Sequence, residues 1–260
     1  MCIDCLLVMT SGVLFAAGAG LIVITHHLKG SDAAGRRLDW VKYNVYLALV
    51  SLLLALGAAG RFYALSFYVV IAAGGTAELY RLLRHNRRSN DRHSERAGRI
   101  YDVTLAGLFF VVAAGLLSHL IFGPARTWRG SYSMVLLLVA ATDSYAQLLG
   151  RLLGRHRLCV RLSPGKTVEG FVGGILSATT LAPALGFLAP DASPPSLALL
   201  GLLTALAAAA GDLLFSFIKR RLGTKDFSGL LPGHGGLLDR FDSLIVAAPV
   251  SYWTRLLLLR

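Results

Sequence analysis

The sequence is 260 residues long, with 55% hydrophobic and only 15% charged residues, whereas soluble domains carry about 25% charged residues. Together with a mean hydropathy of +0.62, this composition argues against an ordinary soluble domain and favours a membrane protein. The net charge of +12 would suggest a nucleic-acid partner in a soluble protein, so the placement of the basic residues has to decide between partners.

Apolar runs of about 20 residues, the length that crosses a bilayer, occur repeatedly along the chain. They predict an all-α, polytopic integral membrane protein with about eight transmembrane helices, within a range of seven to nine. The predicted spans are 6–25, 43–60, 62–79, 103–123, 131–150, 171–189, 197–218 and 244–259. The first run is interpreted as a retained span rather than a secretory signal, because the residues before it contain Asp4 and no basic side chain.

The basic residues are concentrated in alternate loops. Of the 26 Lys and Arg residues, 21 lie in 26–42, 80–102, 151–170 and 219–243. Because basic loops stay on the cytoplasmic side of a membrane, this distribution predicts that the four loops face the cytoplasm and that both termini lie outside. Membrane topology thus explains the net charge, and no nucleic-acid partner is expected.

The Arg-rich loop that begins at Arg84 divides the chain into two regions of one continuous membrane domain. Residues 1–100 are expected to form a membrane scaffold, because their spans are nearly bare of ionisable groups and contain Gly and Ala for helix packing. Residues 101–260 are expected to form the catalytic region, with cytoplasmic loops 151–170 and 219–243.

Asp143 and Asp212 lie inside predicted spans, near their cytoplasmic ends. A carboxylate there is penalised by about 2.5 to 3.5 kcal/mol on insertion scales, so it calls for a reason. Both side chains are therefore candidates for a water-filled site that opens to the cytosol. For Asp143, the alternative is a structural pair with a neighbouring Arg.

The segment 207–243 reads as an apolar helix that becomes polar on one side and then opens into a glycine-rich loop. Asp212, Ser216 and Lys219 are spaced at zero, four and seven residues, which places them on one helical face. Asp239 and Asp242 are three residues apart and are expected to share a face at the beginning of the next helix.

The loop between these two helices contains Pro232-Gly-His-Gly-Gly236, and successive backbone N–H groups in such a turn can form a nest for anions. His234 could donate a proton or could simply hydrogen-bond within the loop. The surrounding cations and carboxylates together indicate a Mg²⁺-bound polyphosphate. They are Lys219, Arg220, Lys225 and Arg240, with Asp212, Asp226, Asp239 and Asp242.

A second cytoplasmic segment, 161–170, contains Gly165-Lys166-Thr167 but does not form a Walker A loop, because Val160 stands where that motif needs glycine. A hydroxyl, a lysine and a helix start near Thr167 can still hold a phosphate or a lipid headgroup. The alternative is a basic juxtamembrane loop that meets anionic lipids.

These residues form a recognisable pattern. The series Ser216-x-x-Lys219-Arg220, Lys225-Asp226 and Pro232-x-His234-Gly235-Gly236-x-x-Asp239-Arg240-x-Asp242 resembles the signature of the phosphatidate cytidylyltransferase family. Asp143-Ser144 with Gly150-Arg151, and Ser163-Pro-Gly-Lys-Thr-Val-Glu169-Gly170, resemble two other recurrent family segments. The resemblance covers roughly 143–243. It departs at Gln147 and Leu148, where many members carry aromatic residues, and in the first hundred residues it is carried only by Ala77-Glu78-Leu79.

The resemblance implies transfer of CMP from CTP to phosphatidic acid at a bacterial inner membrane, with CDP-diacylglycerol and pyrophosphate as products. It implies Mg²⁺, alone or with a second cation, on Asp212 and Asp239, with Asp143 and Asp242 in support, and Lys219, Arg220 and His234 as further catalytic candidates. The expected substrate-binding residues are Ser163, Lys166, Thr167, Glu169, Ser216, Lys225, Asp226, Gly235, Gly236 and Arg240. Monomer and homodimer both remain open.

Three other functions remain open at this point. A cytidylyltransferase for another lipid phosphate and a CTP-dependent lipid kinase use related chemistry, and product analysis distinguishes them. An ion-coupled transporter would use the buried acids to carry protons or cations. The clustering of polar residues toward one side of the membrane argues against an alternating transport path.

Overall fold

The computed structural model describes residues 3–29, 33–89, 128–230 and 235–258; the predicted span 103–123 lies outside them. The described elements, in chain order, are α1 (Ile3–Lys29), α2 (Ala33–Ala59), α3 (Arg61–Ser89), α5 (Trp128–Leu153), β1 (Arg157–Cys159), β2 (Ser163–Thr167), α6 (Val168–Ala184), the 3₁₀ turn η1 (Gly186–Leu188), α7 (Pro194–Arg221) and α8 (Leu238–Leu258).

Long apolar helices dominate this part of the chain. Five of them have the length and composition to cross a membrane, namely Cys5–Leu28, Ala33–Ala59, Arg61–Leu82, Gly130–Leu153 and Pro194–Arg221. Helices α6 and α8 coincide with two further predicted spans. The prediction of an all-α, polytopic membrane protein is therefore confirmed.

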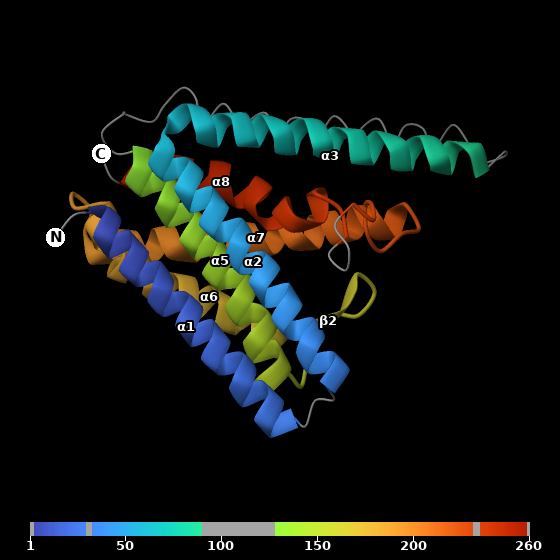
Figure 1. The fold of residues 1–260 in the computed structure, drawn as a ribbon, viewed down its shortest axis with the longest axis horizontal. Helices are drawn as coiled ribbons and strands as arrows, with labels where there is room; N and C mark the ends of the chain where they lie inside the picture. The colour runs from blue at the N-terminus through green and yellow to red at the C-terminus, as the bar shows by residue number, and fades with distance from the viewer. Residues whose placement is uncertain (1–2, 30–32, 90–127, 231–234, 259–260) are drawn as a thin grey trace.

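The helices pack side by side around α5 (Figure 1). Helices α5, α6, α7 and α8 contact one another in chain order, α1 and α2 lie against α5, and α3 lies against α2 and α8. The core between them is apolar and includes Leu138, Ala178, Leu200, Phe215 and Ala247. Side chains of α1 are hardly buried, as expected for a peripheral helix whose apolar surface faces lipid.

Polar contacts fix the first two helices to the rest. Arg151, near the end of α5, donates to Asp39 Oδ1 of α2 at 2.9 Å, and His26 of α1 lies 3.2 Å from Asp39 Oδ2. The hydroxyl of Tyr46 donates to the carbonyl oxygen of Ala140 at 3.1 Å. These contacts hold α1 and α2 beside the middle and end of α5.

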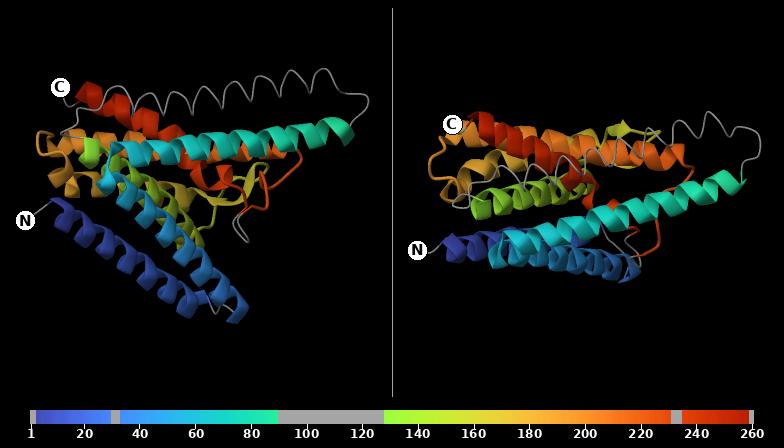
Figure 2. Two further views of the ribbon diagram at one scale, coloured as in Figure 1. Left: turned by 45° about the horizontal axis from the view of Figure 1, so that its top comes forward. Right: turned by 90° about the horizontal axis from the view of Figure 1, so that it is seen from above.

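The ends of α3 and α7, the β-hairpin and the start of α8 gather toward one end of the molecule, opposite the start of α1 and the end of α8 (Figures 1 and 2). This arrangement follows from the alternating directions of the helices. It brings the segments that precede and follow the predicted cytoplasmic loops 151–170 and 219–243 together, and so creates the setting for a polar site.

The segment between α5 and α6, which the sequence analysis treated as a loop, contains a short antiparallel hairpin. Arg157 pairs with Thr167 and Cys159 pairs with Ser163. Thr167 then caps α6, because its hydroxyl oxygen accepts from the N–H of Gly170 at 3.1 Å. The predicted helix start near Thr167 is confirmed, and the hairpin gives the residues before it a fixed direction.

Candidate active site

A cavity of about 1080 Å³ extends between the polar end of the molecule and the helices α1, α2 and α5. Fourteen of the sequence-predicted site residues line it. They are Asp143, Ser163, Lys166, Thr167, Asp212, Ser216, Lys219, Arg220, Lys225, Asp226, Gly235, Asp239, Arg240 and Asp242. Residues that are up to a hundred positions apart in the sequence therefore face one common space.

Asp212 of α7 forms an ion pair with Lys166 of the hairpin. The pair joins the two segments that the sequence predicts to be separate cytoplasmic loops. Asp212 shares its helical face with Ser216 and Lys219, and all three line the cavity. The predicted acid–hydroxyl–base stripe on α7 is thus confirmed, and Lys166 extends it toward the hairpin.

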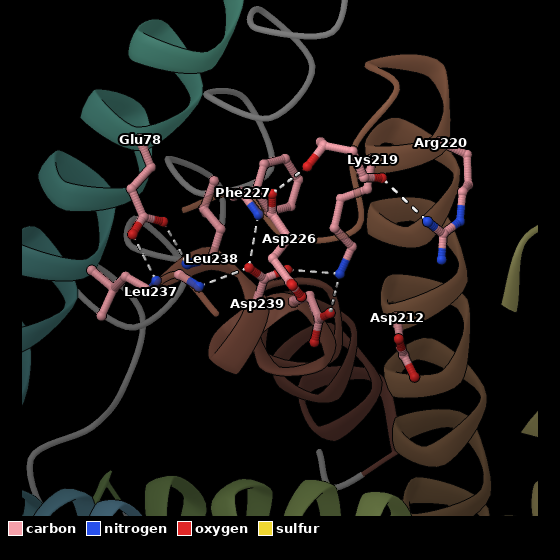
Figure 3. A network of polar contacts seen from close by, with 12 residues as sticks. Glu78, Asp212, Lys219, Arg220, Asp226, Phe227, Leu237, Leu238 and Asp239 are labelled. Atoms are coloured by element: carbon pink, nitrogen blue, oxygen red, sulfur yellow. Dashed lines mark hydrogen bonds and ion pairs between the residues drawn. The ribbon is translucent and has the colours of Figure 1, made fainter. Parts of the chain in front are cut away.

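Lys219, close to the end of α7, connects this stripe to the first turn of α8 (Figure 3). Its Nζ atom lies 2.7 Å from Asp239 Oδ1 and 4.0 Å from Asp242 Oδ2. The Lys219 and Asp239 side chains are only 12% and 3% exposed. Asp239 and Asp242 therefore share a face at the start of α8, as predicted, and a single ammonium group bridges them.

The other carboxylate oxygen of Asp239 holds the loop that precedes α8. Asp239 Oδ2 accepts from the N–H groups of Phe227 at 2.9 Å and Gly236 at 2.8 Å. Gly235, with φ of 78°, makes the turn that allows this approach. The Gly236 amide consequently donates to protein in this structure, while Pro232 to His234 of the predicted anion nest lie outside the described residues.

Asp143 of α5 approaches the same region from the other side. Ser243 of α8 donates its hydroxyl hydrogen to Asp143 Oδ1 at 3.1 Å. Helices α7 and α8 also meet closely here, since a Cβ atom at Gly211 would lie 2.7 Å from the carbonyl oxygen of Asp242. Asp242 makes this contact and Asp212 directly follows Gly211, so the two acids lie near each other on adjoining helices.

Comparison with known proteins shows the family of this chain. The model of the cytidylyltransferase family matches residues 92–258, which include all fourteen predicted site residues that line the cavity. The chain belongs to the cytidylyltransferase family. Family membership therefore covers α5 to α8 and the hairpin, while α1, α2 and α3 lie outside the match.

Individual relatives show where the similarity lies. The chain is 42% identical to the phosphatidate cytidylyltransferase of Bacillus subtilis over 118 residues, which are 45% of this chain and 44% of that protein. It is 37% identical to the enzyme of the same name from Brucella melitensis, over 56% of this chain and 54% of that protein. It is 39% identical to the uncharacterized protein YnbB of Escherichia coli, over 60% and 55% respectively. The chain thus spans about half the length of the curated relatives it matches.

The family site offers hard oxygen donors of the kind that Mg²⁺ prefers. In the described part of the chain, no three Asp, Glu, His or Cys side chains form a ready-made metal cluster. Mg²⁺ is commonly held by one or two carboxylates together with substrate phosphates and water, so Asp212 and Asp239 fit that mode. The ammonium groups of Lys166 and Lys219 contact these two carboxylates, where positive charge is favourable.

Some predicted site residues have other surroundings. Glu169 and Gly236 do not line the cavity. Glu169 accepts from the backbone N–H of His156 at 3.1 Å and contacts His156 Nδ1 at 2.7 Å. Its own backbone N–H and the His156 side chain lower the pKa of the Glu169 carboxyl to about 2. The contacts of Glu169 therefore join the start of α6 to the residue that precedes β1.

Arg220 likewise has clear structural contacts. Its guanidinium donates from Nε to the carbonyl oxygen of Leu162 at 3.1 Å and from Nη1 to that of Thr224 at 3.3 Å. Arg220 thus links the hairpin to the turn that follows α7, at the rim of the cavity that it lines.

Sequence reasoning missed Glu78 of α3, which is buried against the loop before α8. A signal was present, because Glu78 is a carboxylate inside an apolar span and belongs to the Ala77-Glu78-Leu79 triplet. Glu78 falls within residues 1–100, which the sequence predicts to be a scaffold because their spans are nearly bare of ionisable groups.

Proposed function

We propose that this member of the cytidylyltransferase family transfers CMP from CTP to phosphatidic acid, giving CDP-diacylglycerol and pyrophosphate. One observation carries the proposal. A single cavity joins a charged end, with Lys166, Asp212, Lys219 and Asp239, to an apolar wall between membrane helices. Such a cavity suits an amphiphilic substrate whose headgroup must meet a water-soluble nucleotide.

The apolar wall comes largely from the first two helices. Leu14, Phe15 and Ile22 of α1 and Leu49 and Leu53 of α2 line it opposite α5. Acyl chains can remain against such a surface while the phosphate reaches the polar end, because neither part then has to leave its preferred solvent. A lateral opening between α1, α2 and α5 is therefore proposed as the path of the lipid.

The chemistry requires little from a general base. A phosphate monoester has a second pKa near 6, so the attacking oxygen of phosphatidate is already largely anionic. That oxygen bonds to the α-phosphorus of CTP, and the bond between this phosphorus and the bridging oxygen to the β-phosphate breaks to release pyrophosphate. The main difficulty is to bring two anions together and to stabilise the leaving group.

The cations of the site address this difficulty. Lys166 and Lys219 stand at the cavity with their ammonium groups on carboxylates, and Arg220 and Arg240 line the same space. These groups would bind the triphosphate and the lipid phosphate and orient them for in-line attack. The two lysines are preorganised by their carboxylate partners, which lowers the cost of reorganisation during the reaction.

Asp212 and Asp239 are proposed as the Mg²⁺ ligands, with Asp143 and Asp242 in support. When bound, Mg²⁺ would supply positive charge to the triphosphate oxygens. The hydroxyl of Ser216, on the same helical face as Asp212, is placed to hydrogen-bond a phosphate oxygen in the cavity.

We also propose that the site faces the cytoplasm of a bacterial cell membrane and that both termini lie outside. The four basic loops support this orientation, because basic loops remain on the cytoplasmic side. The segments next to these loops lie toward one end of the molecule, where the polar end of the cavity is.

The purified full chain, incubated with CTP labelled at its α-phosphate, phosphatidic acid and Mg²⁺, tests the function. We expect the label to appear in the lipid fraction as CDP-diacylglycerol, with unlabelled pyrophosphate released. Release of labelled CDP with an unlabelled lipid product would instead indicate a kinase. Activity with another lipid phosphate, and none with phosphatidic acid, would overturn the substrate assignment.

A further inference from the structure

Glu78 lies in the apolar span Arg61–Leu82, and only 7% of its surface is exposed. An ionised carboxylate in such a place is unfavourable unless hydrogen bonds or opposite charges compensate it. Among the described residues, the hydrogen bonds to Glu78 come from Ser228, Leu237 and Leu238, on either side of the loop before α8 (Figure 3). The site therefore uses a side chain from the N-terminal region.

Three donors reach the Glu78 carboxylate. Oε1 accepts from Ser228 Oγ at 2.6 Å and from Leu237 N at 2.8 Å, and Oε2 accepts from Leu238 N at 3.1 Å. Helix α8 begins at Leu238, so these two amides belong to the helix end that has no acceptor within the helix. A carboxylate at this position also interacts favourably with the helix dipole. Glu78 thus caps α8 from a helix that lies some 160 residues earlier.

Asp239 holds the adjacent atoms of the same loop. It accepts from Phe227 N and Gly236 N, whereas Glu78 accepts from the next residue in each case, Ser228 and Leu237. The two carboxylates therefore fasten both ends of the loop at neighbouring residues. A shift of this loop would move the Asp239 carboxylate and, with it, the ammonium group of Lys219.

Gly236 shows how closely Glu78 approaches. A Cβ atom at Gly236 would lie 2.7 Å from Glu78 Oε2 and 2.9 Å from Oε1, distances that any larger residue would have to relieve by moving the carboxylate or the loop. The glycine at this position is thus explained by contact with Glu78 rather than by contact with the cavity, which Gly236 does not line.

We infer that Glu78 is a positioning residue that fixes the loop before α8 and, through it, the Lys219–Asp239 pair. Its catalytic consequence rests on the proposed function, but the attachment of the loop does not. Glu78 does not line the cavity, so it acts on turnover through Asp239 and Lys219 rather than by touching substrate. The scaffold region 1–100 accordingly contributes one residue that orders the site.

The experiment compares the full chain with its Glu78→Ala, Glu78→Gln and Thr76→Ala variants in nanodiscs. Glutamine keeps one acceptor oxygen but presents an amide N–H₂ to the second donor. Thr76 is the matched control, since it lies two residues away on α3 and is exposed, and among the described residues its hydroxyl donates to the carbonyl oxygen of Ala72 of its own helix. Hydrogen exchange of the peptide 235–242 and steady-state kinetics are measured on each.

We expect Glu78→Ala to raise hydrogen exchange in 235–242 and to lower kcat about 10- to 100-fold. This is the usual range, about 10- to 100-fold, for residues that hydrogen-bond to a functional group and orient it without contacting substrate. The KM for phosphatidate should stay unchanged, and Glu78→Gln should fall between Ala and the unsubstituted chain. Thr76→Ala should change neither readout. If Glu78→Ala does not insert into the membrane, hydrogen exchange in 235–242 and kcat of Glu78→Gln test the inference in its place.

Unchanged exchange in 235–242, or raised exchange with unchanged kcat, would overturn the inference. Failure of the proposed function has a different signature, because the unsubstituted chain would then form no CDP-diacylglycerol. In that case, exchange in 235–242 still decides whether Glu78 holds the loop.

Discussion

Lys219 donates to Asp239 across 2.7 Å, from the last turns of α7 to the first turn of α8. Both side chains are largely buried, so each depends on the other for compensation of its charge. The aromatic ring of Phe227, whose centroid is 5.6 Å from Lys219 Nζ, covers the pair. This ion pair stands at the centre of the proposed site and is also part of its framework.

Replacing Lys219 by methionine tests that double role. The substitution leaves the Asp239 carboxylate buried without its cation, so we expect a loss of about 3 to 5 kcal/mol in stability. We also expect CMP transfer to fall by at least about 100-fold, because one preorganised electrostatic contact is lost. Thermal unfolding and the labelled-CTP assay measure the two effects separately.

Arg221→Met is the matched control for Lys219→Met. Arg221 is two positions further along α7, is exposed, and lies over the ring of Phe217 at 5.1 Å, away from the lining of the cavity. It should retain activity and stability. Equal losses in both variants would mean that the basic end of α7 acts only by its overall charge.

Asp212→Asn and Asp239→Asn should differ in stability while sharing a loss of Mg²⁺-dependent synthesis. The Asp239 carboxylate accepts from Lys219, Phe227 and Gly236, so its neutralisation should weaken α7–α8 attachment by about 3 kcal/mol. The Asp212 side chain is 33% exposed and has one ion pair, to Lys166. The free energy of unfolding of Asp212→Asn should therefore lie within about 1 kcal/mol of that of the unsubstituted chain.

Activity as a function of Mg²⁺ concentration decides the ligand assignment for these two residues. We expect a loss of about 100-fold or more in each variant, and near-normal turnover in either one would remove that residue as a ligand. Asp191→Asn, an exposed carboxylate in the turn before α7, is the control and should behave like the unsubstituted chain.

Features that depend on neighbours along one helix could be predicted from the sequence. The stripe of Asp212, Ser216 and Lys219 follows from 3.6 residues per turn, and the same periodicity pairs Asp239 with Asp242. The cap at Thr167 also has a local cause, because its hydroxyl reaches an amide three residues later. In each case the spacing along the chain sets the distance in space.

Contacts between distant segments could not be predicted in this way. The Glu78 contact with Ser228 spans 150 residues and depends on how α3 crosses α8, which no local pattern specifies. The hairpin was missed for a different reason, since Pro164 and Gly165 disfavour a strand in isolation. Its pairing with β1 and its connection to α6 stabilise the extended conformation there.

Glu169 makes the attachment of the hairpin sensitive to acid. Its carboxyl pKa is lowered from an ordinary 4.5 to about 2 by its own backbone N–H and by His156. A lowered pKa means that the ionised form is favoured in the folded state, so the stabilisation is complete above pH 4.5 and is lost as the pH falls toward 2. The stability difference between the unsubstituted chain and Glu169→Gln should therefore shrink as the pH falls from 4.5 toward 2. Unfolding of both proteins across this range measures the effect, and a difference that does not change with pH would contradict it.

The buried contact between Thr204 of α7 and Ser251 of α8 should contribute to stability without affecting the reaction. Their hydroxyl oxygens are 2.7 Å apart, and each hydroxyl also lies 2.7 Å from a carbonyl oxygen of its own helix. Neither residue lines the cavity. Because each hydroxyl keeps a local acceptor when the other is removed, we expect a coupling of only about 0.6 kcal/mol between Thr204→Val and Ser251→Ala, as is usual for hydrogen bonds between membrane helices. A double-mutant cycle of unfolding free energies measures this coupling, and the labelled-CTP assay should show unchanged kcat in all three variants. A fall in kcat at constant stability would contradict this expectation, because it would mean that the Thr204–Ser251 contact influences the geometry of the site.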